Sequence, residues 1–213
     1  MRHYTPDDLT KDSEFELLKV VDQRQIKSFI YEQIYEPTKL LRYYGIYQIA
    51  MLVLYVVLLA ISIWSATRGV MEPLWWMLGA LVFSFSVLIV LHELFHAVAY
   101  RLNGVKKLKA GALWRKFIFY VAADRQVVDF TVFKRVALAP FLVVNLLTIM
   151  PGIWLWEHPA CYFFFSLMCL HSLFCAGDIA MLSFYYRHAD KTIYNFDDLA
   201  EGKTFFYTLK KAS

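Results

Sequence analysis

Four long apolar stretches dominate the chain, and most polar residues lie in the segments between them. The stretches are Gly45–Ala66, Pro73–Tyr100, Val136–Trp156 and Ala160–Tyr186. About 20 consecutive apolar residues are enough for a helix to span a bilayer. Each stretch is therefore predicted to be a transmembrane helix. The first follows a polar segment of more than forty residues, so it does not have the pattern of a cleaved signal peptide.

Shorter patterns lie outside these stretches. Between residues 22 and 35, apolar residues recur at helical spacing, which predicts an amphipathic helix along the membrane face. Residues 1–20 show no such period and are expected to be loosely held. The segment FIFYVAA, residues 117–123, is too short to span and too apolar to be freely solvated, so a strand or hairpin is predicted in the loop 101–135. The tail after Tyr186 could form a second hairpin.

Composition and charge support a membrane protein and indicate its orientation. Of the 213 residues, 59% are apolar and 19% are charged, against about 25% charged in soluble domains. Residues 1–43, 101–135 and 187–213 hold 21 of the 22 Lys and Arg residues, and only Arg68 lies in the other connections. Because Lys and Arg stay on the cytoplasmic side, both ends are predicted to be cytoplasmic. The net charge of +4 then reflects topology and contact with the lipid bilayer, and gives no reason to expect nucleic-acid binding.

The predicted fold class is an all-α membrane protein with four transmembrane helices, a cytoplasmic N-terminal amphipathic helix and a small cytoplasmic β element in the loop 101–135. It divides into a cytoplasmic N-terminal segment 1–43, a transmembrane domain 44–186 and a cytoplasmic tail 187–213. Three cysteines lie in or near the fourth span, and their spacing suggests neither a disulfide framework nor a zinc ribbon.

Candidate chemistry lies inside the second span, where His92, Glu93 and His96 form the motif H-E-x-x-H. Histidines four residues apart share a helix face and can bind one zinc ion, and the glutamate can act as a general base. In random order this composition would give the motif about 0.006 times per chain. Histidines that only bond neighbouring helices are the alternative. A glutamate in a span costs about 2.5–3.5 kcal/mol, however, so it needs a partner or a function.

A third ligand is predicted at Asp178, the only acidic residue inside another span. His92 lies nine residues before Arg101, and Asp178 lies nine before Arg187, so both sit about 13 Å inside the same boundary. His171 would be about 10 Å deeper, which favours a hydrogen bond between helices over a place in the metal site.

Asn145 falls at a similar depth, about 15 Å from the cytoplasmic boundary. Its amide could contact a substrate carbonyl or orient a ligand. Intramembrane asparagines also tie helices together. Both interpretations stay open.

The motif His92-Glu93-Leu94-Phe95-His96, a basic loop, and CAGD in a later span resemble the zincin peptidase family of bacterial membrane proteins. That family is similar to the site-2 intramembrane metalloproteases. The resemblance covers roughly residues 40–190. It implies zinc held by the H-E-x-x-H helix and a later aspartate, in the bacterial inner membrane. The chain has only Gly177-Asp178 where typical site-2 proteases carry the longer N-P-D-G or L-D-G signature.

The predicted function is that of an intramembrane zinc metalloprotease acting on membrane-embedded or membrane-adjacent peptide substrates. His92, His96 and Asp178 would hold zinc, and Glu93 would carry the proton. The alternatives are a non-catalytic zinc-binding membrane scaffold and a zinc hydrolase acting on lipidated substrates. A zinc transporter is disfavoured, because the far halves of the spans offer little polar lining.

Overall fold

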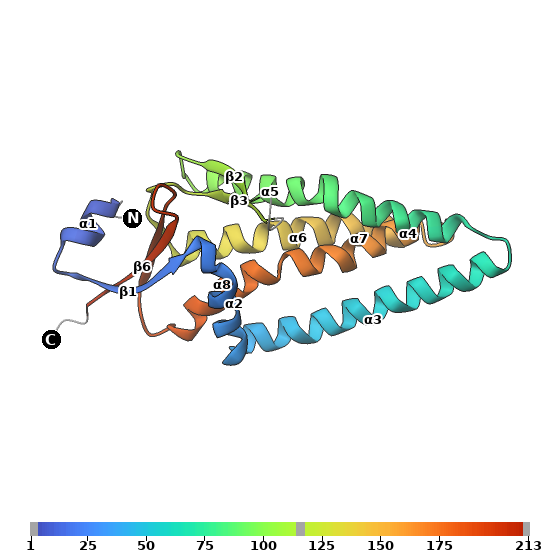
Figure 1. Ribbon diagram of the computed structural model, residues 1–213, viewed down its shortest axis with the longest axis horizontal. Coiled ribbons are helices and arrows are strands. Elements are labelled where there is room, and N and C mark those ends of the chain that lie inside the picture. The colour runs from blue at the N-terminus through green and yellow to red at the C-terminus, as the bar shows by residue number, and fades with distance from the viewer. Residues whose placement is uncertain (1–3, 114–117, 211–213) are drawn as a thin grey trace.

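Long helices lying side by side make up most of the molecule (Figure 1). The computed structural model describes residues 4–113 and 118–210. Three of its helical runs are long and apolar enough to cross a membrane, or four if the bent pair α7 and α8 counts as one span. This is compatible with a multi-pass membrane protein. The runs are α3 (Lys39–Thr67), α4 to α5 (Glu72–Leu102), α6 (Phe130–Trp154), and α7 (Cys161–Phe174) with α8 (Ala176–Arg187).

Capping side chains explain where two of these helices begin. Thr38 accepts a hydrogen bond from the Leu41 N–H at the start of α3, and Asp129 accepts one from the Val132 N–H at the start of α6. Such caps satisfy N–H groups that the first helical turn leaves without partners. The cap at Asp129 starts α6 six residues before the predicted span at Val136.

The second span contains a break in its helical pattern. It consists of α4 (Glu72–Phe83), a π-helical turn η2 (Ser84–Leu88) and α5 (Ile89–Leu102). A π turn has a wider hydrogen-bonding pattern than an α turn and often occurs at functional sites. Here it immediately precedes the helix that carries the H-E-x-x-H motif.

The fourth span is bent, where a single helix was predicted. The axes of α7 and α8 differ by 46°, with Cys175 between them. Asp178 lies in the first turn of α8. The bend therefore separates α7, which packs mainly on α6 and α4, from α8, which carries this carboxylate and packs on α2, α3 and α6.

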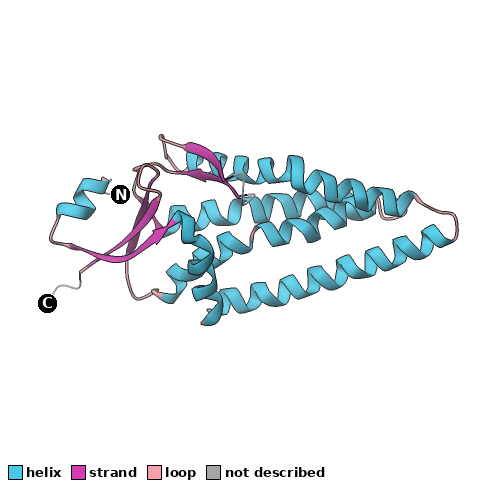
Figure 2. Ribbon diagram, in the orientation of Figure 1, coloured by secondary structure: helices cyan, strands magenta, loops and turns pink. Residues whose placement is uncertain are grey.

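A four-stranded antiparallel sheet corrects the all-α prediction (Figure 2). Its strand order is β1-β6-β5-β4, so a strand from the N-terminal segment pairs with the C-terminal hairpin. Residues 15–20, which were expected to be loosely held, are consequently ordered in a strand. The strands are β1 (Phe15–Asp22), β4 (Val128–Asp129), β5 (Ile193–Asp198) and β6 (Lys203–Leu209).

The sheet is attached to the helices by a buried aromatic cluster. Phe206 of β6 has no exposed surface and packs on Phe29 and Phe184, with ring centroids 6.2 and 4.8 Å away. Buried aromatic side chains contribute much of the apolar area removed from water in such cores. The strands are therefore an integral part of the fold.

The predicted β element in the loop 101–135 is confirmed. β2 (Lys109–Leu113) and β3 (Ile118–Ala122) form an antiparallel hairpin beside α5. Residue 117, which begins the predicted segment, lies outside the described residues. Gly111 is paired with Tyr120, whose ring lies where a side chain at position 111 would stand.

The predicted N-terminal amphipathic helix is also present. A short helix α1 (Pro6–Lys11) precedes β1, and α2 (Ile26–Tyr35) follows it after one 3-10 turn, η1 (Gln23–Gln25). α2 packs against α8, and Ile30 lies over Gly177. The apolar face of α2 thus contacts the protein itself.

Candidate metal centre

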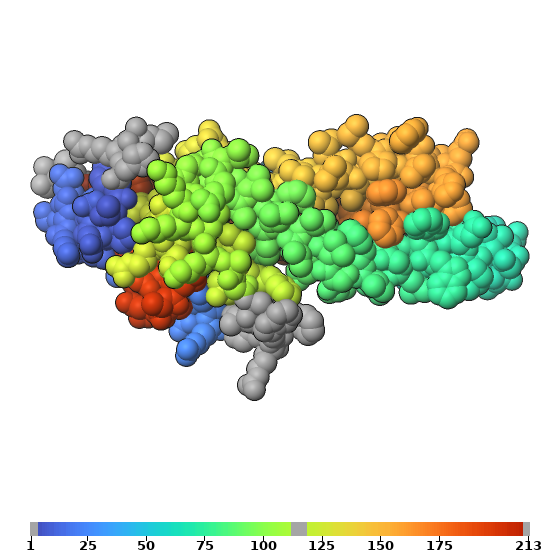
Figure 3. Space-filling model, turned by 90° about the horizontal axis from the view of Figure 1, so that it is seen from above, coloured from blue at the N-terminus to red at the C-terminus, as the bar shows by residue number. Residues whose placement is uncertain are grey.

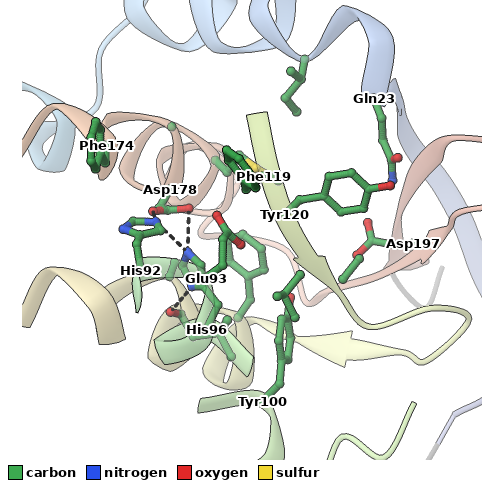
Figure 4. Close-up of a pocket in the computed structure, with 18 of the residues that line it drawn as sticks. Gln23, His92, Glu93, His96, Tyr100, Phe119, Tyr120, Phe174, Asp178 and Asp197 are labelled. Atoms are coloured by element: carbon green, nitrogen blue, oxygen red, sulfur yellow. Dashed lines mark hydrogen bonds and ion pairs between the residues drawn. The ribbon is translucent and has the colours of Figure 1, made fainter. Parts of the chain in front are cut away.

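Three side chains from two helices converge at the motif. His92 and His96 lie one turn apart on α5, and Asp178 approaches from α8 (Figure 4). The two Nε2 atoms are 3.1 Å apart. His92 Nε2 is 3.2 Å from Asp178 Oδ2, and His96 Nε2 is 3.4 Å from Oδ1. The three residues that were selected by their spacing and position in the sequence therefore lie close together in space.

These distances fit a zinc ion. Nitrogen and oxygen ligands bound tetrahedrally at about 2.0–2.1 Å from zinc lie about 3.3 Å from one another. The three separations, 3.1, 3.2 and 3.4 Å, lie close to that value. Asp178 Oδ2 is buried and receives no hydrogen bond of acceptable geometry from the described residues. A cation between the three groups would complete the coordination of this oxygen.

The other ring nitrogen of each histidine has its own partner. His96 Nδ1 is 3.0 Å from the carbonyl oxygen of Val136 on α6. A carbonyl oxygen can only accept, so Nδ1 carries a proton, and in the neutral ring Nε2 presents a lone pair towards Asp178. His92 Nδ1 is 3.1 Å from Nε2 of His171 on α7. Both rings are buried, which restricts them to these orientations.

Glu93 faces the same space and supplies a group able to move protons. It lines a cavity of about 460 Å³ together with His92, His96 and Asp178. Its carboxylate lies near the Val121 backbone N–H in β3. Glu93 lies beside the three ligand side chains (Figure 4) but is not part of their group of close donor atoms, so it can act on a molecule bound in the cavity.

The cavity walls come from parts of the chain that are far apart in the sequence. α5 and α8 provide the ligands, and α2 covers one side through Ile26, Lys27 and Ile30. β3 forms another wall through residues 119–122, and β5 contributes Asn195 and Asp197. No local pattern predicts that α2 and β5 reach the cavity, since each is placed by packing between distant segments.

Two further polar residues of the spans are placed by their hydrogen bonds. Asn145 accepts a hydrogen bond from the Tyr47 hydroxyl on α3 at 2.9 Å, and donates to the Phe141 carbonyl at 2.7 Å. It does not line the cavity, so these contacts are those of a residue that ties helices together. His171 makes the expected bond between helices. Its partner is His92, so it lies much nearer the site than the predicted 10 Å separation in depth.

A seven-residue interval could have revealed the position of His171. His171 and Asp178 lie two helical turns apart, so both face the same side of the span. Side-chain length and the bend at Cys175 then bring the imidazole to the histidine pair. Cys175 also lies here, which gives a second group of close donor atoms: His92, His171 and Cys175.

Comparison with known proteins places this centre in a family. The model of a family described as "putative zincin peptidase" matches residues 85–193, just over half of the chain. The match includes the H-E-x-x-H motif, β2, β3, α6 and Asp178. No curated protein and no solved structure matches the chain. Zincins are zinc peptidases, and the donor set at the motif suits that metal. On this match, the chain belongs to the putative zincin peptidase family.

Proposed function

We propose that this protein is an intramembrane zinc metalloprotease of a bacterial inner membrane, which hydrolyses peptide bonds of membrane-embedded or membrane-adjacent substrates. The observation that carries the proposal is the convergence of three zinc-type ligands and the Glu93 carboxylate on one cavity. Family membership supports the peptidase part. The long apolar helices around the site support its place in the membrane.

In this proposal His92, His96 and Asp178 hold the metal. Zinc, when bound, would act as a Lewis acid towards water and the scissile carbonyl. Glu93 would accept a proton from the attacking water and then deliver it to the leaving amine. Glu93 lines the cavity together with these ligands, so it can reach a molecule bound there.

Strand β3 is the proposed guide for the substrate. It pairs with β2 on one side, and among the described residues no strand pairs with its other side. Its residues 119–122 line the cavity beside the motif. A helical substrate must unwind before its carbonyl can be attacked, and a strand at the edge of a sheet can hold an extended segment by strand addition.

The membrane setting is supported by the surface of α3. Its apolar side chains are widely exposed, with Ile46, Leu52 and Trp64 at 64%, 63% and 56%. Exposed apolar area on this scale is unusual for a soluble monomer. Lipid would cover it, which agrees with the charge distribution of the loops.

Glu93→Gln tests the proposal directly. Gln is close to Glu in size but cannot accept the proton, so peptide hydrolysis should fall by about 10²-fold or more. Zinc content should remain, because Glu93 is not among the three ligands. The measurement is cleavage of a model transmembrane peptide in detergent or liposomes, with zinc determined on the same sample. Glu72→Gln, an exposed change of the same kind at the start of α4, is the matched control.

The outcome also separates the alternatives. A non-catalytic zinc-binding scaffold would keep its biological activity in Glu93→Gln with zinc in place. A zinc hydrolase acting on lipidated substrates would lose activity, but only lipidated peptides would be cleaved by the unmodified protein. Cleavage of an unlipidated peptide that disappears in Glu93→Gln would support the protease.

A further inference from the structure

His171 contacts the proposed metal ligands His92, His96 and Asp178 through His92, at the ring nitrogen that does not face the other two. It lies on α7, has no exposed surface, and its Nε2 is 3.1 Å from His92 Nδ1. Cys175, one turn later, places its sulfur 3.6 and 3.7 Å from the two ring nitrogens of His171. The imidazole is therefore enclosed between a metal-ligand histidine and a thiol.

The direction of the bond between His92 and His171 decides whether His92 can bind a metal. If His92 Nδ1–H donates to His171, then His92 Nε2 presents a lone pair to the cluster. If His171 donates instead, a neutral His92 carries its proton on Nε2. That proton would point at Asp178 Oδ2, 3.2 Å away, and would occupy the place of the metal.

The two ligand histidines differ in how strongly their hydrogen-bond partner determines the tautomer. The Val136 carbonyl beside His96 can only accept, so it fixes one tautomer. His171 is able to donate or to accept. In metal centres, a group that accepts the hydrogen bond from the second nitrogen of a ligand histidine orients the ring and raises its basicity. His171 stands in that position relative to His92.

We propose that His171 is a positioning residue of the metal centre, which accepts the Nδ1–H of His92 and thereby directs the His92 Nε2 lone pair at the ion. The inference rests on the proposed zinc site and is independent of whether the protein cleaves peptides. The depth of His171 in the predicted span, counted in residues from the boundary arginine, does not reveal this role.

A second metal site at His92, His171 and Cys175 is the competing interpretation, since these donor atoms also lie within 4.8 Å of one another. With both sites filled, His92 would have to ligate through both nitrogens and lose its last ring proton. The hydrogen bond requires no such loss, so the structure favours the positioning role.

Substitutions that keep or withdraw the acceptor test the proposal. Gln places its amide oxygen close to the position of the histidine Nε2, whereas Asn carries the same groups on a side chain one carbon shorter. Zinc affinity of the purified full-length protein is measured by competition with a chromophoric chelator. We expect His171→Asn and His171→Phe to weaken affinity by roughly 10–100-fold, and His171→Gln to stay within a few-fold of the unmodified protein. Visible spectra of the cobalt-substituted proteins should be altered in the same order.

Each result has a defined meaning. Zinc affinity in His171→Asn equal to that in His171→Gln, with both proteins monodisperse and helical, would overturn the positioning role. Two zinc ions per chain, one of them lost in Cys175→Ala, would overturn it in favour of the second metal site. Cys175→Ala with one ion bound at unchanged affinity supports it. If the affinity order holds but no variant, nor the unmodified protein, cleaves peptides, only the protease proposal fails.

Discussion

Asp178 has the most demanding position of the three proposed ligands. It lies on a different helix from the two histidines. Its Oδ2 atom is close to His92, and its Oδ1 atom is close to His96. The Oδ2 atom of Asp178 is buried. A buried carboxylate oxygen without compensation is costly, so its presence in a predicted span indicates a partner. Zinc provides one with suitable distances.

Asp178→Ala should therefore lower the zinc content of the purified protein well below one ion per chain. Removing one of three protein ligands leaves two histidines, which bind zinc much more weakly. Elemental analysis after gel filtration measures the content, and Asp190→Ala, an exposed change outside the spans, serves as control. Undiminished zinc in Asp178→Ala would show that another residue is the third ligand.

Asp197 makes stability depend on pH in an unusual direction. Burial raises the pKa of Asp197 to about 6, and nearby Asp124 adds to the rise, while a hydrogen bond from Thr204 opposes it. An unfolded aspartate titrates near 3.9. The folded state thus binds this proton more tightly, so its contribution to stability falls as pH rises from about 4 to 6.

Asp197→Asn should remove that dependence. Between pH 4 and 6.5 the melting temperature of Asp197→Asn should increase relative to that of the unmodified protein, and the difference should level off above pH 6.5. Thermal unfolding in detergent at a series of pH values measures it. Asp190→Asn, at an exposed position, should show a constant difference. A constant difference for Asp197→Asn as well would contradict the assignment.

The sequence predicted those residues of the candidate site whose positions follow from their spacing along a helix. The i, i+4 interval identified His92 and His96, and distance from the boundary arginines selected Asp178. His171 was assigned a bond between helices, but its partner was not foreseen. Axial rise measures backbone positions, whereas contact depends on side-chain reach and on the 46° bend.

Among the secondary-structure elements, η2 has the clearest consequence for the site. A π turn holds one residue more than an α turn, and the flanking helices keep their orientation. Deleting Ser86, an exposed residue of this turn, should convert it to regular α-helix and leave α5 facing Asp178.

Deletion in an ordinary turn should act differently. Removing Leu78 from α4 would rotate one part of the helix by about 100° against the other. We expect the Ser86 deletion to keep most of its zinc and the Leu78 deletion to lose folded protein or zinc. Zinc content per folded chain measures both. Equal loss in the two deletions would show that η2 does not act as an adjustable turn.

Elements were predictable where a local pattern carries them. Apolar length identified the spans, and helical spacing identified α2. β1 was missed because its partner β6 lies far away along the chain, so no local pattern marks the pairing. The bend between α7 and α8 was missed because apolar residues continue through it.

The molecule as a whole places the four-stranded sheet at one end of the helices (Figure 1). The space-filling view shows the blue N-terminal and red C-terminal parts of the chain together at that end (Figure 3). β1 precedes α3, β4 precedes α6, and β5 follows α8. Because these strands share one sheet, the segments that contain them must lie on the same side of a membrane. Charge counting reaches the same grouping independently.

Labels at opposite ends of the helices test this arrangement. Single cysteines at Arg68 and Glu157, in a background without native cysteines, should react with a membrane-impermeant thiol reagent from outside intact cells. A cysteine at Lys191 should react only after permeabilisation. Protection of the Glu157 position in intact cells would contradict four crossings.

The position of β6 between β1 and β5 has a consequence for biosynthesis. β1 leaves the ribosome early, yet its partner follows about 180 residues later, a separation that delays pairing whatever the strength of the final sheet. β5 also lines the cavity. A nascent chain with its helices already formed would therefore still have an unfinished cleft, and the proposed hydrolysis would have to wait for completion of the sheet.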